Sequence, residues 1–152
     1  MSLVKAMMII RQSDVKGETL RSSCGMPLIL CSIPPRIQRM LDDANYQTIS
    51  INTPLSKALL QYPTEERSAR LEKELQIILN ADGPLLLIDF EMLFDPRHKI
   101  DVLKLFCERA RIIDLAILWP GYCSSKKLCY AAPEDPDYHE YDCDKYQIRI
   151  VR

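Results

Sequence analysis

A junction that could bind nucleotide lies between an apolar segment at 27–32 and an amphipathic segment that starts near Ile37. Many α/β proteins have a phosphate-binding loop at such a junction, with the pattern G-x-x-x-x-G-K-[ST]. Aligned without gaps, Ser32 and Ile37 occupy the two glycine positions, Gln38 the lysine position and Arg39 the hydroxyl position. The junction therefore has the placement of a nucleotide-binding loop without its usual residues.

The same junction has lost the backbone groups that such a loop uses. A phosphate-binding loop works because several successive N–H groups point inward at the phosphates. Pro34 and Pro35 carry no N–H, and the segment 32–39 contains no glycine that could adopt positive φ at low cost. Arg36 and Arg39 could clamp a phosphate instead, but two solvated arginines are the simpler interpretation, since cations at the start of a helix oppose its dipole. Ordinary ATP binding is not expected.

A second candidate is the carboxylate pair at the end of the apolar run PLLLIDFEMLF, which looks like a Walker B element. In such an element a buried strand delivers an Asp to the carboxyl edge of the sheet, where it holds Mg²⁺ directly or through water. Asp89 would take that role, and Glu91 could polarise an attacking water. An Asp is also a common turn former at the end of any strand, so the pair alone does not establish this chemistry.

The remaining polar residues indicate no further reaction. Many ATPases have a polar residue that senses the γ-phosphate after the strand that would end at Trp119, but here Pro120 follows. The acidic segment 134–144 lacks the calcium-loop pattern and is interpreted as a solvated loop or as the rim of a contact with a protein partner. His98 and His139 have no nucleophile partner at a recognisable spacing. A zinc site would have to be assembled from ligands that are not closely paired, namely Cys123, Cys129, His139 and Cys143.

Strand and helix patterns alternate along the chain, which favours an α/β sheet. Strands are expected at 27–32, 46–51, 85–88, 114–119 and 127–131, with a final antiparallel strand at 146–151. Helices are expected at 3–12, from Pro35, at 54–61, after a Thr64 cap and after an Asp95 cap, with a loop at 13–26. The predicted fold is one three-layer domain over residues 1–152, with a five-stranded, mostly parallel sheet. In the predicted order, the strand at 114–119 lies between the strands at 27–32 and 85–88, as in P-loop ATPases.

Composition limits the partners. Lys plus Arg is 20 and Asp plus Glu is 21, for a net charge of −1. This balance argues against a general nucleic-acid coat protein, although it allows a local basic patch. No apolar run is long enough to span a membrane, and no secretory signal is recognisable. We therefore expect a cytoplasmic protein with reduced thiols, in which Cys31 and Cys107 act as small hydrophobic residues.

Five segments between Ser50 and Tyr141 carry a family resemblance. They are SINTPLSKALLQYPTEER, LLLIDFEMLFDP, KIDVLKLF, ILWPG and the most distinctive one, KKLCYAAPEDPDYHEY. Together they resemble the small P-loop protein of type 3 BREX bacteriophage-resistance systems. The resemblance implies a P-loop NTPase-like domain that acts with other proteins of a prokaryotic antiviral defence system.

The chain departs from this family where chemistry would occur. The family has a glycine-rich loop and a lysine at 32–39, an Asp three residues before the Glu, and a polar residue after the Trp. This chain has neither glycine nor lysine in that loop. Ile88 occupies the position of the family's Asp, and Asp89 lies one place later. Pro120 follows Trp119 in place of the polar residue. The resemblance and these losses predict a degenerate, non-catalytic member that works through protein contacts and needs no metal or other cofactor.

Two alternatives stay open. One is an active NTPase with a rearranged loop, in which Asp89 holds Mg²⁺ while Arg36 and Arg39 contact the phosphates of ATP. The other is a DNA-binding accessory module built on Arg36, Arg39, Arg109 and Arg111, whose affinity would fall steeply with salt.

Overall fold

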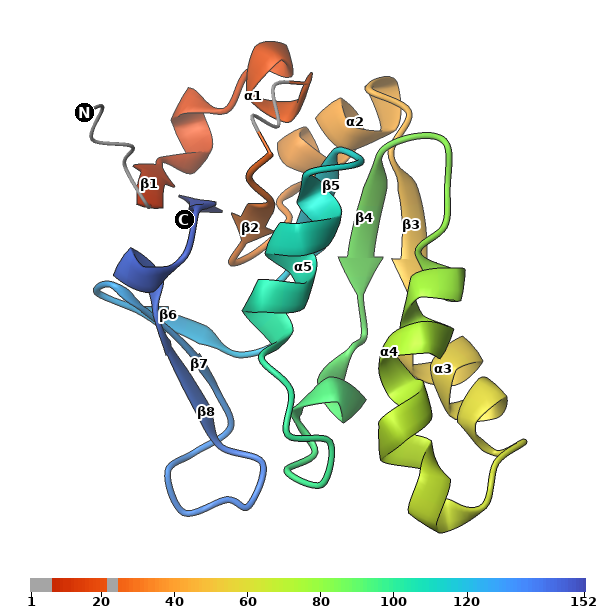
Figure 1. Ribbon diagram of the computed structural model, residues 1–152. Coiled ribbons are helices and arrows are strands. Elements are labelled where there is room, and N and C mark those ends of the chain that lie inside the picture. Colours follow the sequence, from red (N-terminus) through yellow and green to blue (C-terminus); the bar gives the residue numbers. More distant parts are fainter. Residues whose placement is uncertain (1–6, 22–24) are drawn as a thin grey trace, which may run out of the picture.

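The computed structural model describes residues 7–21 and 25–152 and contains a central sheet of six strands. All neighbouring strands in this sheet are parallel. From one edge to the other they are β1 (Met7–Ile10), β9 (Ile148–Val151), β2 (Leu28–Leu30), β5 (Leu115–Leu118), β4 (Leu85–Ile88) and β3 (Gln47–Ser50). The arrows of β2, β3 and β4 point downward in Figure 1, so the carboxyl edge of the sheet faces the bottom of that view.

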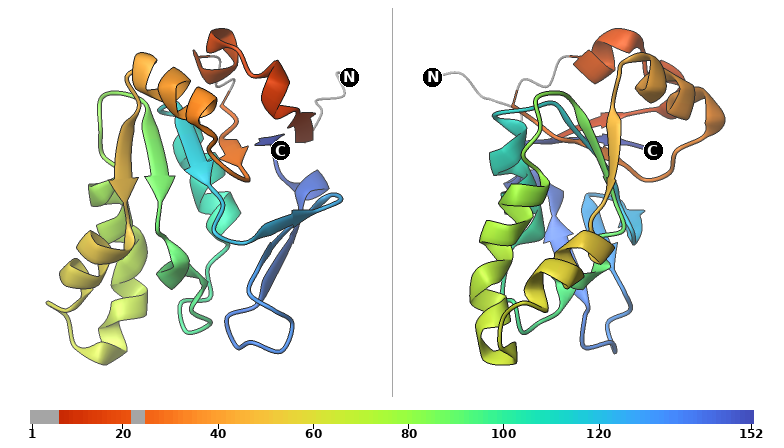
Figure 2. Two further views of the ribbon diagram at one scale, coloured as in Figure 1. Left: turned by 180° about the vertical axis from the view of Figure 1, so that it is seen from behind. Right: turned by 90° about the vertical axis from the view of Figure 1, so that its right-hand side faces the viewer.

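Helices cover both faces of the sheet and give the domain three layers, as the right-hand view of Figure 2 shows. Successive side chains of a strand point to opposite faces, and accordingly Leu85 and Leu87 enter one core while Leu86 enters the other. The first core includes α3 (Asn52–Leu59), α4 (Arg67–Ile78) and α5 (Val102–Ala110), and the second α1 (Gly17–Arg21) and α2 (Pro35–Asp43). Short 3-10 helices lie at η1 (Gln12–Asp14), η2 (Thr64–Glu66), η3 (Glu91–Phe94) and η4 (Cys143–Lys145). None of the described helices is long and apolar enough to cross a membrane.

A second, antiparallel sheet lies beyond the carboxyl edge of the first, near the bottom of Figure 1. Its strands are β6 (Tyr122–Ser124), β7 (Lys127–Tyr130) and β8 (His139–Asp142). Aromatic side chains join it to the main domain. The ring of Phe94 stacks on that of Tyr130 with centroids 4.2 Å apart, and Trp119 Nε1 donates a hydrogen bond to the Cys129 carbonyl at 2.9 Å.

Several expectations about the main sheet are confirmed. Strands occupy 28–30, 47–50, 85–88 and 115–118, and helices follow at 35–43 and 52–59. Pro35 begins α2, where its missing N–H costs nothing. β5 pairs with β2 on one side and β4 on the other, as predicted for the strand at 114–119.

The sheet differs from the predicted one at both ends of the chain. It has six strands rather than five, because residues 7–10 form edge strand β1 instead of part of a helix; residues 3–6 of that predicted helix lie outside the described residues. Residues 127–130 do form a strand, but it belongs to the second sheet. The last strand is parallel rather than antiparallel, since the chain leaves β5, builds the second sheet at the carboxyl edge and re-enters the main sheet between β1 and β2. The predicted loop at 13–26 contains α1.

Two predicted helix caps were wrong. Asp95 does not begin a helix; α5 starts at Val102, and Asp101 caps it by accepting a hydrogen bond from the Lys104 N–H at 3.0 Å. Thr64 lies in η2, and α4 follows from Arg67 without a side-chain cap. In both places a tight turn precedes the helix. The residue that was predicted to cap the helix lies in that turn instead.

Candidate functional site

The loop between β2 and α2 emerges at the carboxyl edge of the sheet, where ligands bind in open α/β folds. The loop is short: Cys31 N donates to the Val151 carbonyl at 3.1 Å, and Gln38 N already donates to the Pro34 carbonyl at 3.0 Å in the first turn of α2. Pro34, at the N-cap position of α2, is extended, with φ of −68° and ψ of 160°. This geometry leaves few backbone N–H groups to surround a phosphate.

Two of the four polar side chains predicted to contact nucleotide, those of Ser32 and Arg36, contact the segment after β1. Arg36 Nη1 donates to the Gln12 carbonyl at 3.0 Å and Nη2 to the Val15 carbonyl at 2.6 Å. Gln12 Nε2 donates to Ser32 Oγ at 2.8 Å. The segment after β1 thus covers the loop, and Arg36 anchors that segment.

The other two predicted contacts lie on the surface of α2. Gln38 Nε2 donates to Asp42 Oδ1 at 3.0 Å, one helical turn away. The residue in the lysine position therefore stabilises α2. Arg39 is exposed and has no hydrogen bond or ion pair with residues 7–21 or 25–152. The four residues therefore do not converge on one ligand in this structure.

Replacing Arg36 with Gln should lower the free energy of unfolding by about 1–2 kcal/mol, because two hydrogen bonds from a charged donor are lost. Urea unfolding followed by circular dichroism measures the change. The matched control is Arg39→Gln, the same substitution on the same helix at an exposed position, which should cost less than about 0.5 kcal/mol. Equal effects of the two substitutions would contradict the anchoring role.

A disulfide fixes the same loop from the other side. Cys31, directly after β2, is bonded to Cys123 of β6, with Cα atoms 6.7 Å apart. This corrects the expectation of reduced thiols, and it removes Cys31 as a simple packing residue and Cys123 as a zinc ligand. Cys107, Cys129 and Cys143 are free. The loop and the second sheet are therefore held together covalently.

The carboxylates of Asp89 and Glu91 lie at the carboxyl edge as predicted, next to side chains at the end of β3 and the start of α3. Ser50 Oγ donates to Asp89 Oδ2 at 2.7 Å, and Asn52 Nδ2 donates to Glu91 Oε2 at 2.5 Å. Asn52 Oδ1 also accepts from the Met92 N–H at 3.1 Å. Sequence reasoning missed Ser50 and Asn52, although Ser50 ends β3 and Asn52 begins α3 directly after it.

Asp89 itself has positive φ, 51°, which is uncommon for a residue other than glycine. It is exposed, whereas Glu91 is half-buried. The hydrogen bonds to Ser50 and Asn52 fix the turn that follows β4, which is the structural role that any Asp at a strand exit can have. Among the described residues no group of three or more His, Cys, Asp or Glu side chains is arranged to hold a metal ion. Mg²⁺ binding by Asp89 stays a prediction.

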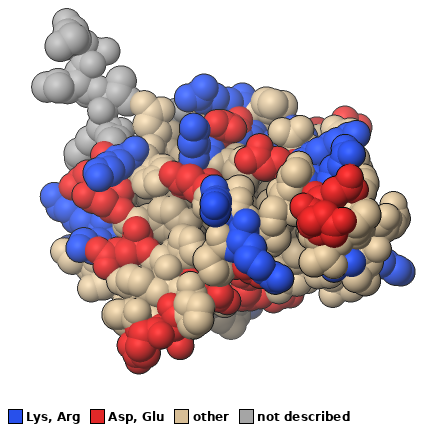
Figure 3. All heavy atoms as spheres, turned by 60° about the horizontal axis from the view of Figure 1, so that its bottom comes forward, with Lys and Arg blue, Asp and Glu red and all other residues tan. Residues whose placement is uncertain are grey.

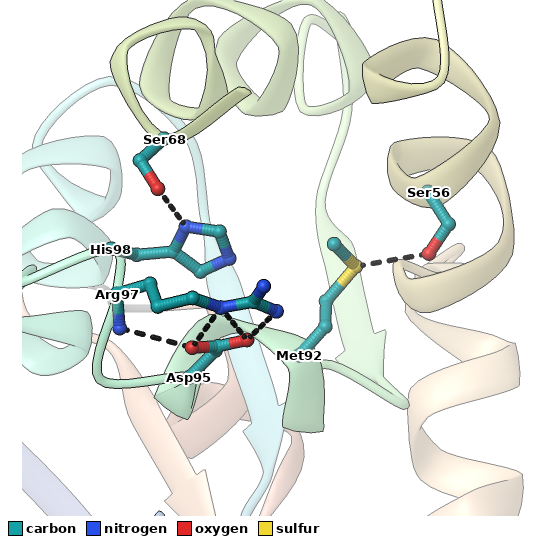
Figure 4. A network of polar contacts seen from close by, with 6 residues as sticks. All are labelled: Ser56, Ser68, Met92, Asp95, Arg97 and His98. Carbon is teal, nitrogen blue, oxygen red and sulfur yellow. Dashed lines mark hydrogen bonds and ion pairs between the residues drawn. The ribbon is translucent and has the colours of Figure 1, made fainter. Parts of the chain in front are cut away.

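A separate pocket of about 350 Å³ lies between α3, the start of α4 and the segment after β4. Sequence reasoning missed it, because its residues come from three elements and match no motif. Figure 4 shows its polar centre, with Ser68 of α4 above His98 and the Asp95–Arg97 pair, and with Met92 and Ser56 across the hollow. Contrary to the expectation for His98, Ser68 Oγ lies 2.9 Å from its Nδ1.

The pKa values of Asp95 and His98 in this pocket are both lowered. Hydrogen bonds from the Arg97 guanidinium lower the pKa of Asp95 to about 2, partly opposed by burial. Burial lowers the pKa of His98, while Asp95 opposes that change. At neutral pH the pocket therefore holds a paired carboxylate and an uncharged imidazole.

The arginines of the proposed DNA-binding patch are dispersed. Arg109 Nη2 donates to the Leu79 carbonyl at 2.8 Å, which joins the ends of α5 and α4, whereas Arg36 holds the segment after β1. Figure 3 views the molecule from the side of the carboxyl edge, and on this face Lys and Arg are interspersed with Asp and Glu. This face therefore does not provide the continuous positive field that DNA binding uses.

Comparison of the chain with models of protein families, with curated protein sequences and with solved structures finds no match.

Proposed function

We propose that this protein is a degenerate P-loop NTPase-like domain that has no catalytic activity and acts through protein contacts in prokaryotic defence against bacteriophages. The observation that carries the proposal is the use of Arg36 and Ser32, at the place of the phosphate-binding loop, to hold the segment after β1. A triphosphate would have to displace these contacts.

The strand order supports the P-loop part of the proposal. β5 lies between β2, which precedes the loop, and β4, which ends at Asp89. P-loop ATPases of one large class place a strand between their Walker A and Walker B strands in the same way. A domain can keep this order while its loop loses function, because the order depends on the buried apolar strands and not on the exposed residues that follow them.

The losses around the loop support the absence of catalysis. Pro34 and Pro35 supply no N–H, the disulfide joins Cys31 to β6, and Pro120 provides no side-chain donor. A surface that no longer binds nucleotide is available for another protein. The exposed acidic residues Glu134 and Asp135, in the loop between β7 and β8, would form its rim. The resemblance of residues 50–141 to a BREX component supports a partner from the same defence system.

The experiment compares the unmodified chain with the double substitution Asp89→Ala, Glu91→Ala in two assays. Saturating ATP–Mg²⁺, at a hundredfold excess over a dissociation constant, would stabilise a binding-competent protein by about 2.7 kcal/mol. For a chain of this size, that corresponds to a rise in the melting temperature of about 5–10 °C. We expect no rise for either protein.

The second assay measures phage plating in a host that carries the defence system. Deletion of the gene should restore plating, and the double variant should protect as well as the unmodified protein, because protection relies on contacts and not on hydrolysis. An ATP-dependent rise in melting temperature that the double substitution abolishes would establish the active alternative. Undiminished protection after the gene is deleted would refute the role in defence.

A further inference from the structure

We propose that the pocket between α3, α4 and the segment after β4 binds a small organic phosphate ester, a ligand site independent of the lost nucleotide loop. Its volume of about 350 Å³ lies within the range of small-molecule sites, roughly 300–1,000 Å³. Both apolar and polar side chains line the pocket. The apolar side chains are Leu59, Leu60 and Met92, and the polar ones are Ser56, Thr64, Arg67, Ser68, Asp95, Arg97 and His98.

The two guanidinium groups are anchored in a way that leaves donors for a ligand. Arg97 uses Nε and Nη2 on the carboxylate of Asp95. In Figure 4 its other terminal nitrogen, which no dashed line reaches, points to the hollow. Arg67 Nε donates to the Tyr62 carbonyl at 3.1 Å, and its terminal nitrogens make no hydrogen bond to the described residues. Guanidinium groups fixed in this way lose little entropy when they bind a phosphate, whose geometry they match.

His98 adds a third donor. When Ser68 Oγ–H donates to Nδ1, the neutral ring carries its proton on Nε2. Figure 4 shows Nε2 on the side of the ring that faces Met92 across the hollow. Asp95 is the one acid among the lining residues, and Arg97 neutralises it, so Arg67 leaves the pocket with a net positive charge. An anion with several acceptor oxygens satisfies these donors, and an apolar body packs on Leu59, Leu60 and Met92.

The contacts favour binding over covalent catalysis. In a Ser-His-Asp triad the imidazole contacts Ser through one nitrogen and a carboxylate through the other, which orients the ring. Here Arg97 occupies the carboxylate of Asp95, and Ser68 contacts Nδ1. Among the described residues, no group forms a hydrogen bond with Nε2 of His98. This nitrogen can therefore donate a hydrogen bond to a ligand.

The test uses phenyl phosphate as the probe, with phenol as a partial probe that lacks the phosphate, in calorimetry and in NMR of the His98 ring. Phenyl phosphate should bind saturably and shift the His98 ring signals, whereas phenol should not. Arg97→Gln should weaken binding about tenfold to hundredfold, because charge-assisted contacts are lost. Since the Arg97 side chain is 77% exposed, the variant should fold; His98→Gln and Arg67→Lys provide further weakened variants.

Arg39→Gln is the matched control, because it removes the same charge from α2, the helix that follows the former nucleotide loop. Binding unaffected by Arg39→Gln and weakened by Arg97→Gln supports the pocket. Binding lost in Arg39→Gln alone would move the ligand to the former nucleotide loop and overturn the proposal. No saturation with phenyl phosphate, or equal binding of phenol, would also overturn it. None of these outcomes depends on a role in phage defence.

Discussion

Replacing Gly121 with alanine should lower the free energy of unfolding by about 3 kcal/mol or more, one of the largest effects expected for a single methyl group in this chain. A Cβ at this position would lie 1.8 Å from the Cys129 carbonyl oxygen and 3.0 Å from the Tyr130 Cα. Both are backbone atoms of β7, so no side-chain rotation can relieve the overlap. The strand would have to move, and the hydrogen bond from Trp119 Nε1 to the same carbonyl would be lost.

Gly83 provides the matched control for this experiment. A Cβ added there meets no atom within 4 Å, so Gly83→Ala should change stability by no more than about 0.5 kcal/mol, or stabilise the fold slightly by restricting the unfolded chain. Urea unfolding of both variants compares the two positions directly. Similar stabilities would show that β7 does not pack against Gly121 as the structure has it.

The core of the main sheet could be predicted from the sequence because its signals are local and physical. The runs LLLI and LAIL are apolar throughout, and only a strand covered on both faces buries every side chain of such a run. Pro35 marked the start of α2 because its fixed φ suits a first helical position. The predicted adjacency of β5 to β2 and β4 followed from the resemblance of the loop and of Asp89 to nucleotide-binding elements.

The ends of the sheet could not be predicted, because their partners are far away in the sequence. The direction of β9 depends on where the chain re-enters the sheet after β8, and alternation within Tyr146–Val151 carries no information on that path. The helical pattern of residues 3–12 was misleading because the apolar residues of Met7–Ile10 also suit an edge strand beside β9. Pairing with β9 makes this segment a strand and not a helix.

The site was predictable in position but not in its contacts. The carboxyl edge followed from the strand order, and Asp89 lies there. Arg36 binds the carbonyls of Gln12 and Val15, more than 20 residues earlier in the chain, and no local pattern indicates such a contact. The pair of Ser68 and His98 is separated by 30 residues and joins two elements, so no spacing rule indicates it. A functional assignment that relies on the position of a motif alone therefore says where a side chain lies but not what it contacts.

The disulfide between Cys31 and Cys123 should contribute about 3–4 kcal/mol to stability, the second large effect that we expect. It closes a loop with a sequence separation of 92 residues, and in the chain-entropy account a long closed loop lowers the entropy of the unfolded state the most. The double substitution Cys31→Ser, Cys123→Ser should therefore lower the melting temperature by about 10 °C. Dithiothreitol should lower it by a similar amount in the unmodified protein and leave the double variant unchanged.

Cys107→Ser is the matched control, because it removes a cysteine whose thiol is free. Burial raises the pKa of Cys107 to about 11, so this thiol is largely uncharged and unreactive at neutral pH. The variant should keep both the unmodified stability and the sensitivity to dithiothreitol. Alkylation of Cys31 and Cys123 in the denatured but unreduced protein would contradict the bond itself. If dithiothreitol cleaves the link between the two peptides without lowering the melting temperature, the bond adds nothing to stability, and the aromatic contacts of Phe94 and Trp119 alone hold the second sheet on the domain.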